Sequence, residues 1–67
     1  MENQEVIDKL LNYLINRKET VLRRWIVKEL IPFTNIPIVS ETLRFIAIND
    51  NDLEVQLYTR ELLNHKL

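Results

Sequence analysis

Residues 43–57, LRFIAINDNDLEVQL, are where the choice between an all-α and a β-containing fold arises. This stretch is compatible with two structures. Residues 43–48 favour strands and residues 53–57 alternate between apolar and polar, so the polar residues 49–52 between them could close a β-hairpin. Alternatively, both segments are helical, and Asn51 with Glu54 three residues later would form a capping box at the start of the second helix. The rest of the chain favours one of these two structures.

The composition favours helices. The chain has 67 residues, of which 46% are hydrophobic and 28% charged, so it is predicted to form one globular domain spanning residues 1–67. It contains no glycine, and tight β-hairpins depend on Asn-Gly or Asp-Gly turns, whereas helices can turn without glycine. The absence of glycine therefore counts against the β-hairpin.

The first half of the chain has the apolar spacing of two helices. The spacing predicts a helix over residues 4–15, with Asn3 as its N-cap, and a second over residues 20–31, which Pro32 ends. A single helix over both segments is the alternative, since the apolar stripe keeps its phase across the polar residues 16–20. Such a helix would be about 42 Å long, which is too long for a compact chain of this size. We therefore predict a helical hairpin.

The second half repeats the first. Pro37 suits the first turn of a helix, and the pattern predicts helices over residues 38–48 and 52–65. A shift of about 33 residues aligns Val6 with Val39, Leu10 with Leu43, Ile15 with Ile48, Asn16 with Asn49, Leu22 with Val55, Trp25 with Tyr58 and Leu30 with Leu63. Two pairs do not match, Leu11 with Arg44 and Ile26 with Thr59. The predicted fold is an all-α bundle of two αα-hairpins.

Residues 43–63 also resemble a HEAT-type helical repeat. In that family an aspartate-rich turn follows an apolar helix, and a Glu-Val-Arg-like segment opens the next helix. The matching residues here are 48–56 and the pair Leu62 and Leu63. Gln56 replaces the usual arginine and Leu53 stands where proline is common, while the first half retains Arg23. The resemblance implies a protein-binding scaffold without catalytic residues.

Stacked hairpins would have two further consequences. Corresponding turns would lie side by side, which would place Arg17 and Lys18 next to residues 50–52; two separately solvated turns are the alternative. Each end of a two-hairpin stack would also leave an apolar face open, because such repeats bury their faces against neighbours. A homodimer or docking on another protein would cover these faces.

The usual residues of catalysis are missing. Without glycine there is no phosphate-binding glycine-rich loop, and without cysteine there is no thiolate metal site. The only histidine, His65, lies near the end of the chain, where it suits the negative end of a helix. We therefore expect no enzymatic activity, metal, cofactor or small-molecule substrate. The net charge of −1 and the polar N-terminus predict a cytoplasmic protein without a membrane partner.

The predicted function is that of a protein-binding adaptor or regulator that acts through a helical surface and self-associates. The candidate interface residues are Trp25, Phe33, Tyr58 and Arg24. Trp25 fits either the core or an interface, where tryptophan is enriched at hot spots. The alternative function is a small nucleic-acid-binding regulator that uses the basic stretch 17–28, with Arg17, Arg24 and Lys28 on one helical face.

Overall fold

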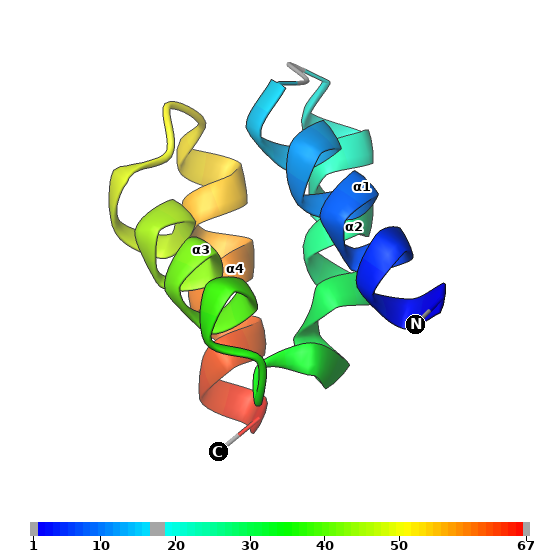
Figure 1. Ribbon diagram of the computed structural model, residues 1–67. Helices are drawn as coiled ribbons and strands as arrows, with labels where there is room; N and C mark the ends of the chain where they lie inside the picture. The colour runs from blue at the N-terminus through cyan, green and yellow to red at the C-terminus, as the bar shows by residue number, and fades with distance from the viewer. Residues whose placement is uncertain (1, 17–18, 67) are drawn as a thin grey trace.

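The computed structural model describes residues 2–16 and 19–66, which fold into two helical hairpins. Their helices are α1 (Glu2–Asn16), α2 (Thr20–Leu30), α3 (Pro37–Asn49) and α4 (Leu53–Lys66), with a short 3-10 helix, η1 (Ile31–Phe33), after α2. Helices α1 and α2 run antiparallel, as do α3 and α4 (Figure 1). The predicted all-α bundle is confirmed, and the β-hairpin alternative is wrong, since residues 37–49 and 53–66 are helical.

Helix ends agree with the predictions to within two residues, but both predicted N-caps are wrong. Asn3 lies inside α1, which already begins at Glu2. At the start of α4, the Oδ1 atom of Asp52 accepts the backbone N–H of Glu54 at 2.9 Å, so Asp52 is the capping residue in place of Asn51. The two prolines act as predicted: Pro32 follows the end of α2, and Pro37 opens α3.

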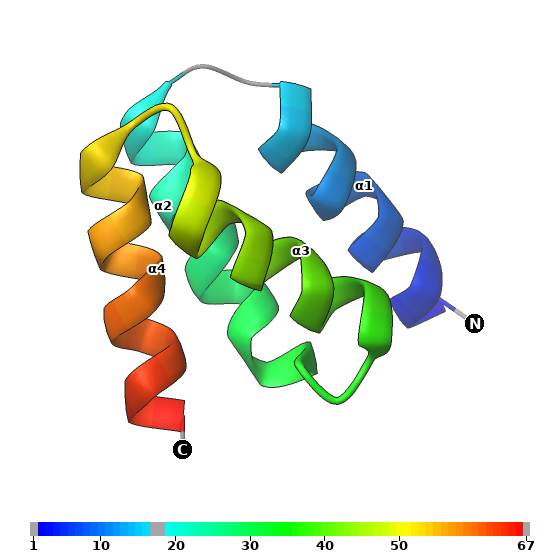
Figure 2. The same cartoon turned by 90° about the vertical axis from the view of Figure 1, so that its left-hand side faces the viewer.

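The helices form two layers. In one layer α2 packs against α4, and in the other α1 and α3 lie further apart (Figure 1). The turn between α3 and α4 lies next to the beginning of α2, and the chain crosses from one hairpin to the other at the opposite end, through η1 (Figure 2). The end of α1, the beginning of α2 and the turn between α3 and α4 are therefore at the same end of the molecule.

One hydrophobic core connects the two hairpins. All four helices contribute to it, with Ile7, Leu11, Leu14, Ile26, Val27, Leu30, Val39, Leu43, Ile46 and Val55 buried. Thr59 of α4 is also fully buried, and its hydroxyl has no hydrogen-bond partner among the described residues. Within residues 2–16 and 19–66, no helix is both long and apolar enough to span a membrane.

Candidate protein-binding surfaces

An ion pair joins the two hairpins at their turn end. The guanidinium of Arg23, on α2, donates to both carboxylate oxygens of Asp50, with an Nη1–Oδ2 distance of 2.9 Å. Only 11% of the Arg23 side chain and 6% of the Asp50 side chain are exposed. Nε of Arg23 also donates to the carbonyl oxygen of Leu14, near the end of α1, at 3.2 Å. One side chain thus ties α1 and α2 to the turn before α4.

A second polar contact lies next to this ion pair. The hydroxyl of Thr20, the first residue of α2, donates to Oδ2 of Asp52. This hydrogen bond has the largest effect on the pKa of the Asp52 carboxyl, and it lowers that pKa. Desolvation has the next largest effect and raises it, while the backbone N–H groups of Glu54 and Val55 and the charge of Arg23 lower it further. Asp52 therefore caps α4 and links it to α2 as a carboxylate.

The acidic turn is occupied by these structural contacts. Asp50 accepts the N–H of Asp52 at 2.9 Å in addition to its bonds from Arg23. In the part of the chain that the structure describes, no three His, Cys, Asp or Glu side chains are grouped as a metal site would require. His65 is exposed, with its Nε2 atom 3.8 Å from Oε2 of Glu61. The arrangement supports a structural role for the carboxylates of the turn.

The predicted partners of the acidic turn, Arg17 and Lys18, lie outside the described residues, and the partners that the structure shows come from the start of α2. The sequence contains a signal that Arg23, one of these partners, is buried. Arg23 lies three and seven residues before Ile26 and Leu30, both of which are buried, so it belongs to the apolar face of α2. A charge on that face requires a buried partner of opposite charge.

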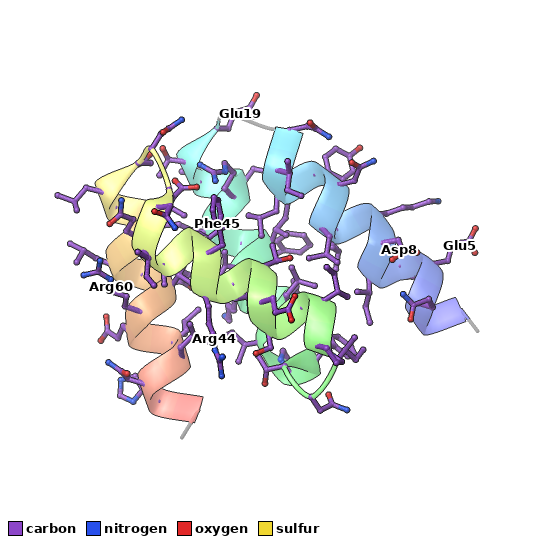
Figure 3. All side chains as sticks on the ribbon, turned by 60° about the vertical axis from the view of Figure 1, so that its left-hand side comes forward. Glu5, Asp8, Glu19, Arg44, Phe45 and Arg60 are labelled. Carbon is purple, nitrogen blue, oxygen red and sulfur yellow. The ribbon has the colours of Figure 1, made fainter. Side chains whose placement is uncertain are left out.

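A groove opens between the two hairpins beside this junction. Its volume is about 1030 Å³, and Arg23 and Asp50 are among the residues that line it. Three apolar side chains from different elements also line the groove, and each is largely exposed: Ile15 by 67%, Phe45 by 63% and Leu53 by 64%. Figure 3 shows Phe45 on the side of α3 that faces α1 and α2. We call this groove, with Ile15, Phe45 and Leu53 as its exposed apolar lining, the junction groove.

The predicted interface residues occupy three different environments. Trp25 is 54% exposed and Val21, one turn before it, is 72% exposed, so the core alternative for Trp25 is wrong. Phe33 and Tyr58 are partly buried and pack against the core. The Arg24 guanidinium lies over the Tyr58 ring, with Cζ 5.5 Å from the ring centroid. Arg24 and Tyr58 thus meet across α2 and α4, and Trp25 remains available to a partner.

The structure describes two of the three residues of the nucleic-acid alternative, Arg24 and Lys28, which lie one turn apart on α2. Arg17 lies outside the described residues, and Lys28 is exposed on α2. Arg24 has an acidic partner, because its Nη1 atom is 3.6 Å from Oε2 of Glu54. The ion pair and the contact with Tyr58 turn Arg24 toward α4.

Comparison with protein-family models, curated proteins and solved structures found no match to this chain. The HEAT-type resemblance of residues 43–63 therefore stays a prediction. The exposed apolar side chains and the contacts between the hairpins are the features that bear on function.

Proposed function

We propose that this protein is a non-enzymatic adaptor or regulator that binds other proteins, and further copies of itself, through its helical surface. The observation that carries the proposal is the amount of large apolar side chain left in solvent. Ten such side chains among the described residues are between 46% and 72% exposed. Contiguous exposed apolar surface is uncommon on small soluble proteins except where they bind a partner.

The position of these side chains supports the same proposal. Val21 and Trp25 are one turn apart on α2, and Ile15, Phe45 and Leu53 surround the junction groove. The buried ion pair and the common core fix the hairpins around that groove. A partner would therefore meet a preformed apolar surface, which reduces the entropy cost of binding.

The HEAT-type scaffold and a cytoplasmic location are parts of this proposal. The repeated hairpins and the aspartate-rich turn support the first. The lack of cysteine is consistent with a reducing compartment, where disulfides are rare. The nucleic-acid alternative has weaker support, because Glu54 partly neutralises Arg24.

The proposal can be tested by capture and sedimentation with the full chain. Trp25→Ala and Phe45→Ala remove exposed apolar side chains, and Glu41→Ala, an exposed polar position on α3, is the control. We expect at least one of the apolar variants to lose a captured protein or self-association while its circular dichroism stays unchanged, and the control to behave as the wild type. A wild-type chain that stays monomeric and captures no protein would contradict the proposal.

Nucleic-acid binding is measured with the same preparation. Binding through phosphate contacts falls steeply as salt is raised. The alternative function would be favoured if the wild-type chain binds a labelled DNA or RNA duplex at low salt and the Lys28→Ala variant does not bind it.

A further inference from the structure

We draw no further inference here: the strongest candidate, the junction groove between the two hairpins, has an exposed apolar lining whose neighbouring charges on Arg23, Asp50 and Asp52 are engaged in contacts that hold the hairpins together, and nothing in the structure shows what covers it.

Discussion

Replacing Asp50 with alanine is the sharpest test of how the two hairpins are held together. The substitution removes the carboxylate that accepts both bonds from Arg23 and the N–H of Asp52. Arg23 would keep its bond to the carbonyl oxygen of Leu14, but its charge would remain in a site where only 11% of the side chain is exposed. An uncompensated buried charge is more costly than the loss of the ion pair itself.

The expected loss in the free energy of unfolding is about 3–5 kcal/mol, the usual cost of removing one partner of a buried ion pair. A chain of this length has a total stability of about 3–10 kcal/mol. The variant should therefore unfold at least about 12 °C below the wild type, since 1 kcal/mol corresponds to about 4–8 °C in a domain of this size. The Asp50→Ala substitution should lower the free energy of unfolding more when Arg23 is present than when Arg23 is itself replaced.

Urea unfolding followed by circular dichroism measures the loss, and a double-mutant cycle with Arg23→Met isolates the pair. Asp8→Ala is the control, because the Asp8 carboxylate is exposed and accepts a bond from Gln4 of the same helix at 3.1 Å; its effect should stay below about 1 kcal/mol. If Asp50→Ala costs no more than Asp8→Ala, or if the two substitutions of the cycle are additive, the ion pair does not hold the hairpins together.

Three further predictions follow from individual side chains. Thr59→Val should raise the free energy of unfolding by about 1 kcal/mol, because it removes a buried hydroxyl without a partner at nearly constant volume; thermal melting measures the change, and a lowered melting temperature would contradict it. The pKa of Asp52 lies below its ordinary value of 3.8 in the folded state, so its contribution is present above that pH and is lost as the pH falls through the lowered pKa. Asp52→Asn should therefore flatten the acid side of a stability–pH curve, and an unchanged curve would refute this assignment. Leu30→Ala should cost about 2–5 kcal/mol in chemical denaturation, since Leu30 is fully buried, and a cost below 1 kcal/mol would show that the core is loosely packed.

The helices themselves were predictable because the signals that set them are local. Apolar spacing located all four, and Pro32 and Pro37 set two of their ends. The N-caps were harder, because adjacent residues such as Asn51 and Asp52 have similar capping side chains. Only the backbone geometry decides which of them lies next to the first free N–H groups of α4.

The candidate surfaces were less accessible to prediction from sequence. Phe33 and Tyr58 pack partly against the core, whereas Trp25 does not. Apolar spacing shows that a side chain belongs to an apolar stripe, but it does not show whether another helix covers that part of the stripe. Ile15, Phe45 and Leu53 were not predicted as interface residues for the same reason: they come from three elements that meet only in the folded chain.

The helical fold class and the approximate helix ends follow from the sequence alone, because backbone preference and apolar period act over a few residues. Tertiary packing sets the pairing of Arg23 with Asp50 and of Thr20 with Asp52. It also buries Thr59, the position equivalent to Ile26, and leaves ten large apolar side chains of the described residues exposed. These features depend on how one hairpin lies against the other. That packing is set by side chains far apart in the chain, and no local pattern specifies which of them will meet.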